Sequence, residues 1–113
     1  ENSDVRHTFP PTPNRVDLWV EQGIHVKGKP EWVFIKIHTH GAQDGDMDTL
    51  LGKPAEDMHR HLNAKYNDGD NYLLHYVSAR EMYNIIKAAE AGEEGNPNAY
   101  RDYILPSPSF KRL

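Results

Sequence analysis

Hydrophobic and polar positions alternate through residues 31–38, EWVFIKIH, the clearest extended segment of the chain. The segment is rich in aromatic and β-branched residues, which favour strands, and successive side chains of a strand point to opposite faces. One face would carry Val33, Ile35 and Ile37. The other would carry Trp32, Phe34, Lys36, His38 and, if the strand continues, His40. A second strand is predicted at residues 72–77, YLLHYV, whose apolar run is typical of a strand covered on both faces.

Two helices are marked by local signals. Residues 54–66 begin with Pro54, which suits a first helical turn, and carry apolar residues at helical spacing. Residues 78–92 begin with Ser78 and Glu81, which match a capping box, and end at Gly92. A third helix is predicted at residues 15–23, with Asn14 as its cap, although the alternation of apolar residues there also fits a strand.

This order of elements predicts an α/β fold. Two strands joined by a helical crossover are expected to be parallel, as in a βαβα section of a parallel-sheet or (β/α) barrel fold. Because two parallel strands cannot bury themselves, the unit should be incomplete by itself. The missing strands would come from a longer chain, from another subunit or from the amino-terminal arm. A first residue other than methionine also suggests a piece of a longer protein.

The chain of 113 residues is expected to divide into an irregular arm at 1–14, an α/β unit at 15–92 and a polar, proline-rich tail at 93–113. Its formal charge of -4 argues against nucleic acid or an anionic membrane as a partner. No apolar run has the length of a membrane span. The absence of cysteine excludes disulfides and thiolate metal sites, whereas seven histidines suggest metal binding or proton transfer.

The candidate site is His38-Thr39-His40, at the end of the first predicted strand. On a strand, residues two apart project from the same side, so both imidazoles can ligate one divalent ion such as zinc. Sites in parallel α/β folds lie at the carboxyl ends of strands. His38 and His40 are therefore candidate catalytic residues and candidate metal ligands, and the sequence does not identify a third ligand. The alternative is a pair of surface histidines at a strand exit.

Lys36 is a third candidate catalytic residue, because the alternation puts it on the same side as His38. A lysine there would bind an anionic group or stabilise a developing oxyanion, and the alternative is an ion pair without a chemical role. The aspartates at positions 44, 46 and 48 alternate along a loop. They lack the full pattern of a calcium loop, so a solvated loop with a helix cap is the simpler interpretation.

The other histidines carry weaker signals. His59 and His61 lie two residues apart on a predicted helix, so they point in different directions and are interpreted as surface residues. His75 lies within the second predicted strand. It is either a hydrogen-bonded core histidine or a general acid or base with a shifted pKa.

Three stretches, VDLWVEQGI, EWVFIKIHTHGA and YLLHYVSAREMYNIIKAAEAG, resemble the carboxyl-terminal part of polysaccharide deacetylase-like proteins. These are carbohydrate esterase relatives built on a distorted (β/α) barrel, and the resemblance covers roughly residues 14–105. It implies metal-dependent hydrolysis of acetylated sugars or polysaccharide, with an aspartate as base and a histidine of a late strand as acid. That histidine would be His38 or His75, with His38 preferred for its place at a strand end.

The family's early Asp-Asp pair and its histidine pair separated by three residues have no counterpart in this chain. The resemblance therefore implies that the metal-binding half lies upstream, and that the piece is not active by itself. The sequence leaves open whether the chain is an enzyme. The alternative function is a non-catalytic α/β module that assembles through its sheet edges, by self-association or with the rest of a parent chain. The compartment cannot be read from the sequence.

Overall fold

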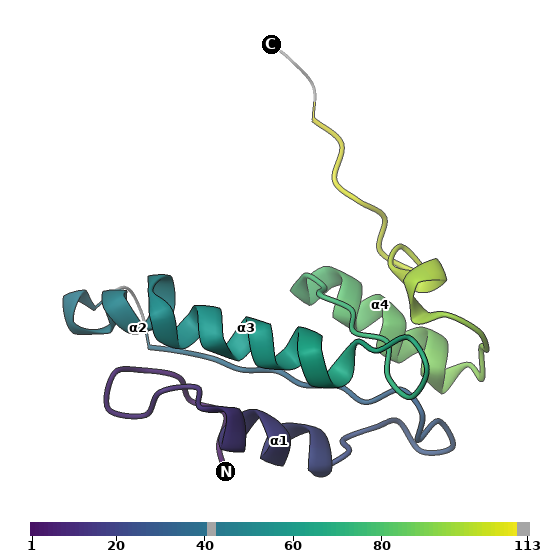
Figure 1. The fold of residues 1–113 in the computed structure, drawn as a ribbon. Helices are drawn as coiled ribbons and strands as arrows, with labels where there is room; N and C mark the ends of the chain where they lie inside the picture. The colour runs from purple at the N-terminus through teal and green to yellow at the C-terminus, as the bar shows by residue number, and fades with distance from the viewer. Residues whose placement is uncertain (41–42, 111–113) are drawn as a thin grey trace. The chain divides into compact units, whose positions relative to one another are not determined.

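A computed structural model describes residues 1–40 and 43–110 (Figure 1). The elements are, in chain order, α1 (Pro13–Glu21), the 3-10 helix η1 (Asp44–Asp46), α2 (Met47–Leu51), α3 (Lys53–Tyr66), α4 (Ala79–Glu90) and the 3-10 helix η2 (Pro97–Tyr100). They belong to two units. The first comprises Glu1–Ile24 and Val33–Leu74, and the second comprises His25–Trp32 and the chain from His75 onward. No helix in the described ranges has the length and apolar composition needed to cross a membrane.

The predicted α/β fold is wrong. Within residues 1–40 and 43–110, the β-structure is limited to two isolated bridges, so there is no parallel sheet and no section of a (β/α) barrel. Residues 31–38 and 72–77 are not assigned to strands. Alternation of apolar residues indicates an extended, half-buried segment, but a strand also needs a partner for its backbone groups. Whether a partner strand exists does not depend on the residues of the segment itself. In the described ranges, the β-pairing of these two segments is limited to the bridge between His38 and Asp4.

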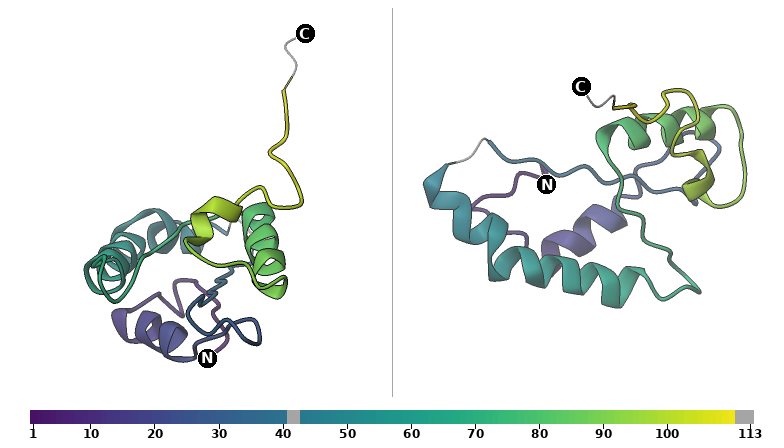
Figure 2. Two further views of the ribbon diagram at one scale, coloured as in Figure 1. Left: turned by 90° about the vertical axis from the view of Figure 1, so that its right-hand side faces the viewer. Right: turned by 90° about the horizontal axis from the view of Figure 1, so that it is seen from above.

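The core of the first unit lies between α1 and α3, which run side by side (Figures 1 and 2). Its buried residues are Val5, Val16, Trp19, Met58 and Tyr66. Ile35 packs against this cluster, whereas Val33 and Ile37 on the same predicted face are 40% and 37% exposed. The apolar stripe of the segment is therefore only partly used for burial.

The helices of the first unit follow their sequence signals closely. The helix expected at 15–23 is α1, which begins at Pro13 and is capped by Thr12, whose side chain accepts a hydrogen bond from the Arg15 amide. The prediction of Asn14 as the cap is wrong, because Pro13 starts the helix earlier and Asn14 lies inside it. The helix expected at 54–66 is α3, with Pro54 in its first turn. In contrast, α2 and η1 occupy part of a stretch that was expected to be a loop, because short helices with few apolar residues carry little periodic signal.

The amino-terminal arm is held by the buried guanidinium group of Arg15. Its Nη1 donates to the carbonyl oxygens of Phe9 and Pro10 at 2.7 and 3.0 Å, and its Nη2 donates to the carbonyl oxygen of Asp4 at 2.7 Å. Nη2 also pairs with the Glu1 carboxylate at 2.7 Å. Hydrogen bonds from Arg15 and Trp19 lower the pKa of Glu1 to about 2. One cation therefore fixes the arm at several points.

In the second unit, α4 has the predicted capping box. Ser78 accepts from the Glu81 amide, and Glu81 accepts from the Ser78 amide at 2.8 Å. Below the cap, the fully buried Asn84 binds the chain that follows the helix. Its amide nitrogen donates to the carbonyls of Arg101 and Leu105, at 2.7 and 2.8 Å. Its oxygen accepts from the backbone amides of Ile104 and Leu105.

This buried amide explains how the predicted polar tail docks. Ile104 and Leu105, two large apolar residues of this segment, remain 50% and 46% exposed, so apolar burial contributes little to its attachment. The segment is attached instead by hydrogen bonds, including those of Arg80 to the carbonyls of Arg101 and Leu105. Buried amides with all their hydrogen bonds made are strong determinants of one local conformation.

We expect Arg15→Met to destabilise the protein by about 3–5 kcal/mol, because it leaves the Glu1 carboxylate without its buried partner. Urea denaturation measures this change. The control is Arg60→Met, since Arg60 pairs with Asp57 at 3.5 Å but its side chain is 74% exposed. That change should cost less than about 0.5 kcal/mol. Equal costs for the two variants would contradict the role of Arg15.

Asn84→Asp should cost about 2 kcal/mol or more, because it places a carboxylate at a fully buried position and removes the two hydrogen bonds to the carbonyls of Arg101 and Leu105. The new carboxylate repels those carbonyl oxygens, so the segment should loosen and hydrogen exchange of the Ile104 and Leu105 amides should also accelerate. Asn63→Asp on the exposed face of α3 is the matched control, and it should change stability by less than about 0.5 kcal/mol. Unchanged exchange at Leu105 in Asn84→Asp would show that another contact holds this segment.

Candidate metal centre

The candidate site is built on a single pairing between two extended segments of the first unit. Asp4 and His38 form a parallel β-bridge. The Val5 amide donates to the His38 carbonyl at 2.8 Å, and the His38 amide donates to the Ser3 carbonyl at 3.1 Å. Side chains of directly paired residues lie on the same side of a bridge. The pairing therefore puts the Asp4 carboxylate next to the His38 imidazole.

His40 joins the same cluster. Its ring and that of His38 are 5.6 Å apart between centroids and meet edge to face at 87°. One carboxylate oxygen of Asp4 and one ring nitrogen of each histidine lie within 4.8 Å of one another. Ligand atoms around a tetrahedral zinc ion lie about 3.4 Å apart, given bonds of about 2.0–2.2 Å. Small side-chain rotations would therefore bring the three atoms to the geometry of a bound ion.

The Asp4 carboxylate has one committed and one uncommitted oxygen. Oδ2 pairs with Nη2 of Arg6 at 2.6 Å. Oδ1 of Asp4 and Nε of Arg6 are buried, and no group of the described residues forms a hydrogen bond with either atom. The carboxylate of Asp4 and the guanidinium group of Arg6 therefore share one ion-pair contact, Oδ2 to Nη2, and not a bidentate pair. A buried carboxylate oxygen without a partner is costly, and a cation is one group that would satisfy it.

The three side chains of the cluster differ in their exposure to solvent. The Asp4 side chain is 13% exposed, His38 is half-buried and His40 is exposed. An ion could therefore enter from solvent on the His40 side. Three protein ligands, two imidazoles and one carboxylate, leave coordination positions open for water or a substrate, as in catalytic zinc sites and in the two-histidine, one-carboxylate sites of iron enzymes.

The structure thus brings together both predicted metal ligands, and it adds Asp4, which sequence reasoning missed. The sequence predicts an irregular arm there, although that arm is also one of the expected sources of missing strands. The usable signal is weak: Asp4 and Arg6 alternate with Val5, as in a short extended segment. Nothing in the sequence specifies that Asp4 pairs with His38.

Lys36 is exposed. Across residues 1–40 and 43–110, no hydrogen bond or ion pair joins its side chain to Asp4, His38 or His40. The catalytic role of Lys36 stays a prediction, and its position in the structure adds no support for it. Asp46 is likewise outside the cluster. Its buried carboxylate accepts hydrogen bonds from the amide and Nδ1 of His7, at 2.9 and 2.7 Å.

Two other histidines differ in their surroundings. His61, expected to be a surface residue, has a side chain only 23% exposed, and its Nε2 lies 2.8 Å from the Asp17 carboxylate. The same carboxylate accepts from the Tyr66 hydroxyl at 2.6 Å and pairs with Lys65 at 3.1 Å. In the second unit, burial lowers the pKa of His75, which favours its neutral form.

Comparisons with protein-family models, with curated proteins and with solved structures found no match to this chain.

The Asp17 cluster predicts a pH dependence of stability. Hydrogen bonds from Tyr66 and His61 hold the pKa of Asp17 well below its usual range. A lowered pKa in the folded state stabilises the protein above the unfolded-state pKa of about 4, and this contribution is lost as the pH falls. We therefore expect Asp17→Asn to be less stable than the parent protein at pH 7.

The stability difference between Asp17→Asn and the parent protein should shrink as the pH is lowered from about 5 to 2. Tyr66→Phe removes the hydroxyl group that donates to Asp17, so its stability should also fall less than that of the parent protein as the pH is lowered. Urea denaturation at a series of pH values measures both effects. A difference that stays constant down to pH 2 would mean that Asp17 is not held as a carboxylate by these partners.

Proposed function

We propose that the protein binds one divalent transition-metal ion, with zinc as the first candidate, through Asp4, His38 and His40. The observation that carries the proposal is the buried, unpartnered Oδ1 of Asp4, in a carboxylate that has a ligand atom within 4.8 Å of both imidazoles. Neutral imidazole and carboxylate are ligands that zinc and iron accept. Arg6 engages Oδ2 and so leaves Oδ1 as the oxygen for the ion.

The neighbouring backbone supports a site of fixed geometry. Two hydrogen bonds set the register of Asp4 against His38. Arg15 binds the carbonyl of Asp4 itself, so the residue that supplies the carboxylate is held from its own backbone. His40 is the most exposed of the three side chains and would close on the ion last. Groups that orient metal ligands in this way commonly change metal affinity by about 10- to 100-fold.

A metal ion with an open position supplies Lewis acidity and lowers the pKa of bound water, which is the chemistry of metal-dependent hydrolysis. Hydrolysis of acetylated sugars therefore stays a proposal, supported by the sequence resemblance and by the ligand set. The barrel that the resemblance implied is not part of this fold. The non-catalytic alternative relied on sheet edges, and the part of the chain that the structure describes has no sheet.

Titration of the chelator-treated protein with Co²⁺ and Zn²⁺ tests the proposal. Visible absorption bands of bound Co²⁺ report imidazole and carboxylate ligation, and competition with a chelating dye gives the Zn²⁺ affinity. We expect one ion per chain, and a loss of affinity of at least about tenfold in each of Asp4→Asn, His38→Gln and His40→Gln.

The controls are His59→Gln and Asp48→Asn, which remove an exposed imidazole and an exposed carboxylate outside the cluster. Both should bind the ion as the parent protein does. Circular dichroism confirms that every variant keeps its helices. The proposal fails if no stoichiometric ion binds at micromolar concentration, or if the controls lose as much affinity as the three ligand variants.

A further inference from the structure

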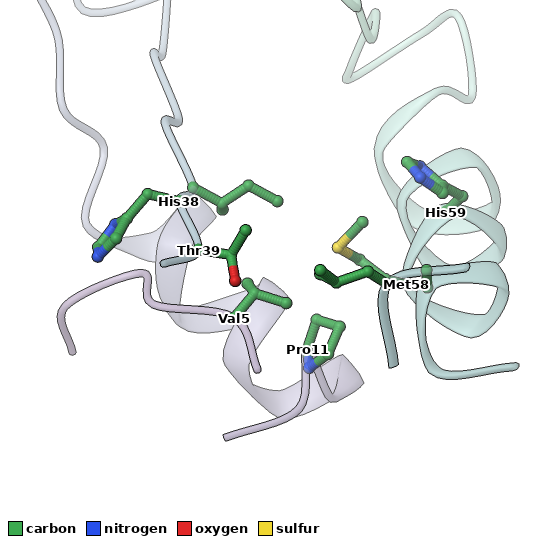
Figure 3. Close-up of a pocket in the computed structure, with 9 residues that line it drawn as sticks. Val5, Pro11, His38, Thr39, Met58 and His59 are labelled. Carbon is green, nitrogen blue, oxygen red and sulfur yellow. The ribbon is translucent and has the colours of Figure 1, made fainter. Parts of the chain in front are cut away.

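A cavity of about 400 Å³ lies in the first unit, beside the His-Thr-His segment (Figure 3). Its lining comes from the arm, the extended segment, α2 and α3. The lining residues are Val5, Pro11, Ile37, His38, Thr39, Leu50, Ala55, Met58 and His59. The volume falls within the range of pockets that hold small organic ligands.

The cavity has a buried floor and an exposed rim. Val5 and Met58, at the floor, are only 4% and 6% exposed, and Pro11 is fully buried. Ile37 and Thr39, at the rim, are exposed to solvent. The floor is continuous with the core, because Val5 and Met58 also belong to the core cluster. A ligand could therefore enter from solvent and reach rigid apolar groups.

The cavity and the metal cluster use opposite faces of one extended segment. Figure 3 shows the ring of His38 directed away from the space between Thr39, Val5 and Met58. The alternation of side chains along an extended chain explains this arrangement, since His38 and His40 point to one side and Ile37 and Thr39 to the other. The cavity is therefore formed mainly on the face that turns away from the metal cluster, and His38 borders both.

The lining specifies the chemistry of a ligand. Among the described lining residues there is no lysine, arginine, aspartate or glutamate, so a charged ligand would lose its hydration without gaining a permanently charged partner. Aliphatic side chains and the adaptable thioether of Met58 favour an apolar body. The Thr39 hydroxyl and the His59 imidazole, which Figure 3 shows on two sides of the cavity, are polar groups at the rim. The Thr39 hydroxyl suits a single hydrogen-bonding group on the ligand.

We propose that this cavity binds a small, uncharged organic molecule with an apolar body and one hydroxyl group, which bonds to Thr39. The body of the molecule lies against Val5, Met58 and Leu50. The hydroxyl group lies at the rim, where the exposed side chain of Thr39 both donates and accepts hydrogen bonds. This proposal does not depend on a bound metal.

Benzyl alcohol is the test probe, and benzoate and benzylammonium are charged probes of nearly the same shape. Methyl NMR spectra of the full chain should show saturable shifts of Val5, Leu50 and Met58 on addition of benzyl alcohol. The charged probes should bind at least about tenfold more weakly. Equal binding of the three probes, or no saturable shift with benzyl alcohol, would overturn the proposal.

Two kinds of variant locate the binding. Ala55→Trp fills the cavity and should abolish the shifts, whereas Ala64→Trp, at an exposed position of the same helix, should leave them unchanged. Thr39→Val keeps the shape but removes the hydroxyl, and should weaken benzyl alcohol binding by about fivefold. Because this last variant leaves α3 unaltered, it tests the proposal even if Ala55→Trp does not fold.

Two further results distinguish this cavity from the metal cluster and from a contact between copies of the chain. His40→Gln removes a metal ligand that does not line the cavity, so it should weaken metal binding and leave benzyl alcohol binding unchanged. The metal proposal and the cavity proposal can therefore fail independently. Shifts of the same methyl groups that depend on protein concentration without any probe would indicate that a second copy of the chain fills the cavity. That outcome would overturn the small-molecule proposal.

Discussion

The guanidinium group of Arg15 is the interaction on which the first unit depends most. Its donors reach the carbonyl oxygens of Asp4, Phe9 and Pro10, and the carboxylate of Glu1. A planar group with five donors in a fixed arrangement is well suited to gathering several acceptors, and lysine could not do the same. Residues 1–12 have no regular structure apart from two isolated bridges, so this side chain adds to the few backbone hydrogen bonds that those bridges supply.

The order of the arm has a chemical consequence. Because Arg15 holds Asp4 by its carbonyl, the carboxylate meets His38 in the register of the isolated bridge. The two faces of the bridged segments then have different characters. One gathers Asp4 with His38 and His40, and the other turns Val5 and Thr39 toward the apolar cavity. A single extended segment thus separates a polar site from an apolar one.

Local sequence signals predicted the helices well, because caps and first-turn prolines act within a few residues of their own position. The capping box of Ser78 and Glu81 and the first-turn Pro54 are examples. The same kind of reasoning failed for residues 31–38, because alternation indicates an extended chain but does not say whether a neighbouring strand exists. The inferred parallel sheet followed from that missing information and not from any residue that forms one.

For the same reason, the sequence predicts the two histidines of the candidate site but not the carboxylate. The spacing of His38 and His40 indicates that both rings share a side, which is a local property of an extended chain. Asp4 is distant in sequence and enters the cluster only through tertiary contacts. Asn84 is a similar case in the second unit. Its position on a helix gave no sign that it would be fully buried and bonded to the chain around Arg101 and Leu105.

The arm and the His-Thr-His segment are held in one register, and hydrogen exchange of two backbone amides tests this register most directly. The amides of Val5 and His38 donate across the bridge. We expect both amides to be protected in the folded protein, and Arg15→Met to remove their protection together. Exchange of these two amides at the rate of an unstructured chain, in the parent protein, would contradict the claim.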